Sequence, residues 1–433
     1  MNRRTAAKGV AGAAALIAVL TLLARVAGFG RTLVFTNTVG AATTGDTYQA
    51  ANTVPNIVFE VVAGGALAGL VVPMLAGGIA AGDREQVRRT ASALLGWALL
   101  VLTPLALVIA LAAGPIAGLL LAGRSDAEIA LAARFLVVFA PQVVLYGIGI
   151  VLAGVLQAHR RFAGPALAPL LSSLVVAGAY LVFAVIGGSR QVSDLSRPAE
   201  LVLGVGTTLG VVALSLSLLL PLRGLGLGLR PSLRFPVGAA PRVRRLALAG
   251  VLTLAGQQLV AAAALRLAAD GPVGTQVVYG AGLTLFLVPW AALAVPLATS
   301  AYPGLTERAE SGDETGYQRS LAPVAVLTVV AAAVAAGVLV AVSGPMARVF
   351  LATASDSKVD ALRDTIVAFG PGLVGYALVA LLTRALSPAA SGRRRRSASS
   401  AAGWWRSSRT SCSPGCCRWP SEGSRWARAT ASV

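Results

Sequence analysis

The chain has 433 residues, of which 56% are hydrophobic and only 12% are charged. This composition is typical of a polytopic membrane protein and excludes an ordinary soluble globular domain. Lys and Arg number 36 against 17 Asp and Glu. These basic residues lie mostly between apolar runs and near the C-terminus, where they set membrane topology, so no nucleic-acid partner is expected.

Residues that usually support catalysis or bind metals are scarce. His159 is the only histidine, and the three cysteines (Cys412, Cys416 and Cys417) all lie close to the C-terminus. No phosphate-binding loop, zinc-ligand spacing or nucleophile motif occurs. The sequence therefore predicts a protein that is not an enzyme, with no metal site and no cofactor.

Apolar runs long enough to cross a bilayer recur along the chain. The arginines between them concentrate in alternate loops, which predicts a cytoplasmic N-terminus. We expect ten membrane spans, at residues 10–30, 48–76, 91–113, 130–156, 165–186, 200–221, 246–268, 276–303, 321–343 and 361–385.

The second of these stretches carries the strongest functional signal. Residues 45–75 are apolar enough to enter a membrane, yet they contain several polar groups and two prolines (Asp46, Asn52, Asn56, Glu60, Pro55 and Pro73). Carboxylates and amides in hydrocarbon are costly unless they face a polar cavity or a partner. The pattern predicts a broken helix that lines a central cavity; the alternative is a kinked packing helix whose polar groups pair with neighbours.

An internal repeat with an offset of 230 residues divides the chain. Gly114-Pro115 recurs as Gly344-Pro345, and Phe139-x-Pro141 recurs as Phe369-x-Pro371. Six spans separate equivalent helices, so both copies keep the same orientation, as in parallel-repeat transporters. We predict an all-α polytopic membrane protein with two parallel-repeat helical bundles around a central cavity. The predicted domains are an N-terminal bundle (1–221), a basic cytoplasmic linker (222–245), an incomplete C-terminal bundle (246–386) and a basic low-complexity tail (387–433).

The tail differs from the rest of the chain. It holds all three cysteines and four of the six tryptophans, with no apolar span. One interpretation is a disordered tail attracted to anionic lipid. The other, which we favour, is a truncated or frameshifted C-terminus, because the second repeat loses its resemblance to the first within a helix.

The N-terminal region resembles the MurJ/MviN-type lipid II flippases of the multidrug/oligosaccharidyl-lipid/polysaccharide exporter superfamily, especially the actinobacterial branch. Matching pieces are Ala24-Arg25-Val26-Ala27-Gly28-Phe29-Gly30-Arg31, Gly45-Asp46-x-Tyr48, Ala51-Asn52-Thr53-x-Pro55-Asn56-Ile57, Gly65-Ala66 and Val72-Pro73. Weaker matches, such as Tyr302-Pro303, extend the resemblance over roughly residues 10–386.

This resemblance implies alternating access and export of a lipid-linked peptidoglycan precursor across the bacterial plasma membrane for cell-wall synthesis. It carries over Arg25, Arg31 and Asp46 as substrate-binding residues, beside Asn52, Asn56 and Glu60 from the polar stretch. Guanidinium groups suit pyrophosphate because they pair with its oxygens in a bidentate manner. Expected partners are the lipid precursor, membrane lipids and cell-wall synthesis proteins. Two alternatives stay open: an exporter of another lipid-linked glycan or amphiphile, and a non-transporting scaffold for cell-wall enzymes.

Overall fold

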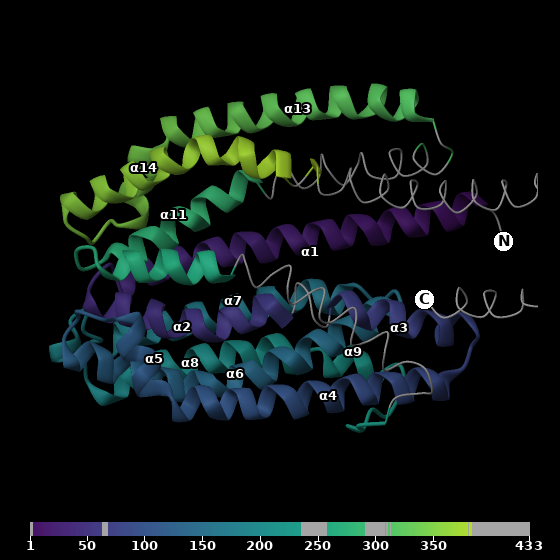
Figure 1. Ribbon diagram of the computed structural model, residues 1–433, viewed down its shortest axis with the longest axis horizontal. Helices are drawn as coiled ribbons and strands as arrows, with labels where there is room; N and C mark the ends of the chain where they lie inside the picture. Colours follow the sequence, from purple (N-terminus) through teal and green to yellow (C-terminus); the bar gives the residue numbers. More distant parts are fainter. Residues whose placement is uncertain are drawn as a thin grey trace, which may run out of the picture. The chain divides into compact units, whose positions relative to one another are not determined.

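The structure is a computed structural model that describes residues 3–62, 68–234, 258–290, 308, 311, 313–379 and 381–382 (Figure 1). Every regular element among these residues is helical. The predicted all-α class is therefore confirmed.

The first 223 residues contain most of the described helices. They are α1 (Arg3–Thr38), α2 (Thr43–Val61), α3 (Ala68–Ala80), α4 (Arg84–Leu111), α5 (Ala113–Leu120), α6 (Asp126–Ala158), α7 (Ala163–Val185), the 3-10 turn η2 (Val192–Asp194), α8 (Arg197–Leu216) and α9 (Leu219–Arg223). Later labelled helices are α11 (Thr275–Pro289), α13 (Glu314–Ala341) and α14 (Ser343–Phe350). Further helical stretches cover Gln258–Ala269 and Asp356–Val379.

Seven helices within the described residues are long and apolar enough to cross a membrane. They overlap seven of the ten predicted spans, and the other three overlap the shorter apolar helices Val71–Ala80, Gln258–Ala269 and Thr275–Pro289. These shorter helices adjoin residues outside the description. The prediction of a multi-pass membrane protein is confirmed.

Local sequence signals explain where several helices begin. Ser125 accepts a hydrogen bond from the backbone N–H of Glu128, and the Glu128 carboxylate accepts one from the backbone N–H of Ser125. This reciprocal capping box satisfies donors that a helix leaves unpaired at its N-terminus. Asp83 caps α4 by accepting from the backbone N–H of Gln86 at 2.8 Å.

The predicted 230-residue repeat is visible in the helix bounds. α13 and α14 begin and end 230 residues after α4 and α5, as Arg84 and Glu314 show. The helix that starts at Asp356 follows the start of α6 by the same interval. Each repeat thus folds as a long helix, a short helix and a second long helix.

α6 lies at the centre of the first bundle, where it packs against α2, α4 and α8. Its buried aromatic residues Phe135 and Phe139 stack with ring centroids 5.7 Å apart. The edges of both rings meet Tyr48 of α2 at 5.9 and 5.8 Å. This aromatic cluster fixes α2 against α6 and so positions the polar side of α2.

Internal contacts divide the chain into two compact units. One comprises Met1–Val288 with Gly337–Gly370, and the other comprises Pro289–Ala336 with Pro371–Val433. In the second unit, the Trp290 and Tyr376 rings meet edge to face at 5.4 Å. The domain boundaries given above stay a prediction, and the tail after residue 386 lies outside the described residues, as do linker residues 235–245.

The described start of the basic linker packs against the first bundle. Arg161 donates to the carbonyl oxygens of Pro221 and Gly224 at 3.1 and 3.2 Å. Farther along, the backbone N–H of Ser232 donates to the carbonyl oxygen of Ser92 on α4 at 3.0 Å. These contacts hold residues 221–232 along the bundle.

Candidate functional site

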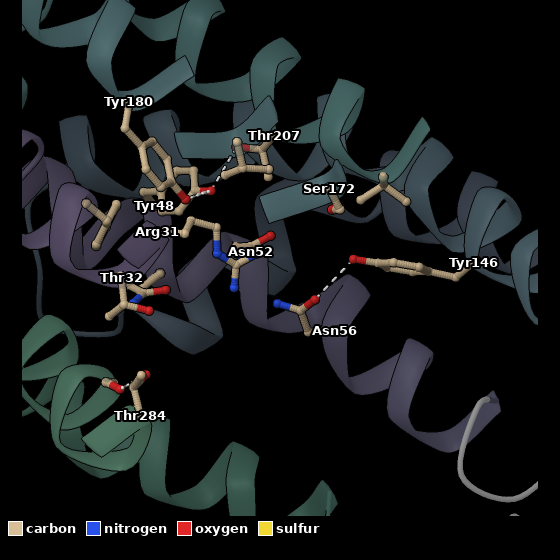
Figure 2. A pocket seen from close by; sticks show the side chains of 15 residues that line it. Arg31, Thr32, Tyr48, Asn52, Asn56, Tyr146, Ser172, Tyr180, Thr207 and Thr284 are labelled. Atoms are coloured by element: carbon tan, nitrogen blue, oxygen red, sulfur yellow. Dashed lines mark hydrogen bonds between the residues drawn. The ribbon is translucent and has the colours of Figure 1, made fainter. Parts of the chain in front are cut away.

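A polar pocket of about 230 Å³ lies inside the first compact unit (Figure 2). Its wall draws on six helices that are widely separated in the sequence. The lining residues are Arg31, Thr32 and Phe35 of α1; Tyr48, Gln49, Asn52 and Asn56 of α2; Tyr146 of α6; Ser172, Val176 and Tyr180 of α7; Thr207 and Val211 of α8; and Gly280 and Thr284 of α11.

α2 contributes three amide side chains to this wall. Gln49, Asn52 and Asn56 are three and four residues apart, a spacing that places them on one side of a helix. Tyr146 donates its hydroxyl proton to Asn56 Oδ1 at 3.2 Å, which Figure 2 shows as a dashed line. Within the described part of the chain, the amides of Gln49 and Asn52 have no hydrogen-bond partner. They are therefore free to bind water or a ligand.

Arg31 is the one charged side chain among the described residues that line the pocket. It forms no ion pair with any described acidic side chain, although six other ion pairs occur in the same residues. A guanidinium stays charged at all physiological pH values and presents a planar fork of donors. The pocket thus offers an uncompensated cation to an anion.

A chain of buried hydroxyl groups forms one side of the pocket. Thr207 donates to the carbonyl oxygen of Leu203 at 2.7 Å, which uses its single proton. Tyr48, 2.8 Å from Thr207 Oγ1, must therefore be the donor to Thr207. Tyr180, 2.7 Å from the Tyr48 oxygen, must in turn donate to Tyr48. The direction of all three hydrogen bonds is fixed, and the Tyr180 oxygen keeps its lone pairs available as acceptors.

This fixed direction makes two tyrosine substitutions unequal. Tyr48→Phe leaves the Tyr180 hydroxyl without its acceptor and Thr207 without its donor, so we expect a loss of about 1–3 kcal/mol in stability. Tyr180→Phe removes only the terminal donor and is expected to cost less. Thermal unfolding of the purified full chain in detergent compares them. Equal losses for the two variants would contradict the assigned direction.

Three of the six predicted site residues lie in this pocket: Arg31, Asn52 and Asn56. The other three lie elsewhere. Arg25 and Glu60 are exposed, on α1 and α2, whereas Asp46 is fully buried. The substrate-binding roles of all six stay predictions.

Asp46 joins the start of α2 to the start of α11. Its carboxylate accepts hydrogen bonds from the backbone N–H groups of Gly274 at 2.7 Å and Val277 at 3.2 Å. The Arg124 guanidinium lies 3.6 Å from Asp46 Oδ2. A carboxylate is favoured at this position because the first N–H groups of a helix lack partners and carry partial positive charge. Gly274 adopts a φ of 103°, in the region that favours glycine.

Sequence reasoning missed several residues that line the pocket. Gln49 had a detectable signal, because it continues the spacing of Asn52 and Asn56 towards the start of α2. Tyr146, Tyr180 and Thr207 had none, since isolated hydroxyl residues in apolar helices do not show which neighbour they face. In the described part of the chain, no group of three or more His, Cys, Asp or Glu side chains is placed to hold a metal ion.

Comparison with known proteins identifies the family of the chain. The family model "Lipid II flippase MurJ" matches residues 35–386. A curated relative from Synechocystis sp., "Probable lipid II flippase MurJ", is 27% identical over 225 residues, which are 51% of this chain. That match spans only 41% of the length of the relative.

Solved structures have the same fold. A lipid II flippase MurJ in an inward closed conformation aligns with a TM-score of 0.71 and 17% identity, covering 86% of this chain and 76% of the other. An inward-facing multidrug resistance MATE family transporter of the MOP superfamily aligns with a TM-score of 0.65 and 14% identity, covering 86% and 81%. With the family model matched over most of its length, the chain belongs to the lipid II flippase MurJ family.

Proposed function

We propose that this protein moves lipid II across the plasma membrane of a bacterium by alternating access, as part of peptidoglycan synthesis. The observation that carries the proposal is Arg31, an unpaired guanidinium in a polar pocket within an apolar helical bundle. A cation without a counter-ion at such a place is costly and marks a substrate path. Membership of the lipid II flippase family supports lipid II as the substrate.

Charge distribution supports an orientation with the N-terminus in the cytoplasm. Arginines concentrate in the segments that follow α3, α6 and α8, which lie on one side if the chain alternates across the membrane. Basic residues in short loops favour the cytoplasmic side. In this orientation the described linker arginines Arg223, Arg230 and Arg234 also face the cytoplasm.

The proposed activity is transport without a chemical reaction on the substrate. The polar groups around the pocket are arginine, amide and hydroxyl side chains, which suit binding. The expected partners are lipid II and the surrounding membrane lipids; contact with cell-wall synthesis proteins is a further part of the proposal.

Reconstitution of the full chain tests the transport proposal. Proteoliposomes loaded with fluorescent lipid II are treated with a membrane-impermeant quencher, and the protected fraction is followed over time. We expect the protected fraction to decline with the protein and to persist in protein-free vesicles. Transport of another polyprenyl-linked glycan but not of lipid II would support the alternative exporter. Persistence of both lipids would overturn transport and favour a scaffold.

A further inference from the structure

The amide side chains of α2 have chemistry different from that of Arg31. An amide left without a partner in an apolar bundle costs free energy, because it loses its hydrogen bonds to water. Gln49 and Asn52 line the pocket without a described protein partner, and Asn56 has only Tyr146. These amides therefore point to a cavity that water or polar ligand groups occupy.

The rest of the lining is also mainly neutral and able to form hydrogen bonds. Thr284 donates its proton to the carbonyl oxygen of Gly280 at 2.9 Å, which leaves its oxygen as an acceptor. The Tyr180 oxygen accepts no described hydrogen bond either. Amide N–H donors thus lie in one cavity with hydroxyl and amide acceptors, while positive charge is limited to one guanidinium. This mixture complements sugar hydroxyls and acylated amines better than it complements a second anionic group.

Gly280 leaves space for the first of these amides. A Cβ atom at this position of α11 would lie 3.0 Å from Gln49 Nε2. A larger side chain would therefore press on the Gln49 amide. With glycine at 280, the Gln49 amide is free to turn towards a ligand.

We propose that Gln49, Asn52 and Asn56 form a subsite for uncharged hydroxyl and amide groups of the lipid II head, whereas Arg31 binds a phosphate of the diphosphate. This assignment rests on the proposed function and adds a division of labour within the pocket. The amides would then determine which glycan or peptide head is accepted, and the arginine would bind any polyprenyl diphosphate. The selectivity of the pocket arises from groups that lose hydrogen bonds when a head lacks the matching polar atoms.

Two lipid probes separate these roles. Lipid II carries the glycan, the peptide and the diphosphate, and undecaprenyl diphosphate carries only the last. Binding of each probe is measured on the full chain in detergent, for the unmodified protein and for Gln49→Met with Asn52→Leu, which keep side-chain size but remove hydrogen bonding. We expect lipid II affinity to fall about tenfold or more, from the loss of two neutral hydrogen bonds. Undecaprenyl diphosphate affinity should change less than twofold.

Matched variants exclude a general effect on folding. Thr53→Val removes a hydroxyl from the same helix; Thr53 does not line the pocket and donates only to the Gln49 carbonyl oxygen at 2.8 Å. It is expected to leave both affinities unchanged. Asn52→Ser keeps a small hydrogen-bonding group and should retain more lipid II affinity than Asn52→Leu. This variant also tests the subsite if the double variant fails to fold.

The outcomes distinguish the subsite from the proposed function. Equal weakening of both probes by the amide variants, or no weakening of either, would overturn the subsite while leaving lipid II transport intact. Failure of the unmodified protein to bind lipid II would overturn the proposed function and the subsite together. Selective loss of lipid II binding would support both.

Discussion

Arg31→Gln should reduce lipid II transport by on the order of a hundredfold or more. Glutamine keeps a polar side chain but removes the charge and the bidentate fork. Each hydrogen bond to a charged group contributes about 1.5–3 kcal/mol, so the loss of two corresponds to about 3 kcal/mol or more. Initial rates of lipid II transport in proteoliposomes measure the effect.

The same substitution should leave the folded protein intact. Arg31 has no ion-pair partner among the described residues, so its removal leaves no buried carboxylate uncompensated. Abundance in the membrane and the melting temperature in detergent are expected to stay close to those of the unmodified protein. An Arg31→Gln variant that transports normally would refute the phosphate role.

Arg25→Gln is the matched comparison on the same helix. Arg25 is exposed and does not line the pocket. We expect its replacement to reduce transport less than replacement of Arg31. Arg31→Lys is expected to give an intermediate rate, because lysine keeps the charge but not the planar fork.

Asp46→Ala is expected to destabilise the protein by about 3–5 kcal/mol, the usual cost of removing one partner from a buried charged pair. The Asp46 side chain is 1% exposed, so water cannot replace it easily. Alanine would leave the N–H groups of Gly274 and Val277 without their acceptor and Arg124 without its nearby carboxylate. Thermal unfolding in detergent and abundance in the membrane measure the loss.

Asp83→Ala is a suitable control for this effect. Asp83 also caps a helix with its carboxylate, but it is exposed and has a single described hydrogen bond, from the backbone N–H of Gln86. Its replacement is expected to cost about 1 kcal/mol. If both alanine variants unfold at the same temperature, Asp46 does not hold α2 to α11 as the contacts indicate.

The sequence by itself determined the helical class, the membrane setting and the internal repeat. Each follows from local properties: the length of apolar runs, the scarcity of charge and recurring residue pairs. The helix bounds of α4 and α5 return in α13 and α14 at the predicted interval. The polar residues Asn52 and Asn56 were also recognisable, because amides are unusual in an apolar helix.

Only the tertiary structure decided which polar residues share a pocket. Arg25 and Arg31 are six residues apart on one helix, yet one is exposed and the other lines the cavity. Asp46 contacts backbone groups more than 220 residues away along the chain, a pairing that no local pattern specifies. Tyr180 and Thr207 meet Tyr48 only because α7 and α8 pack beside α2. Such contacts depend on the rotation and depth of each helix in the bundle, which apolar periodicity leaves open when most of a helix is hydrophobic.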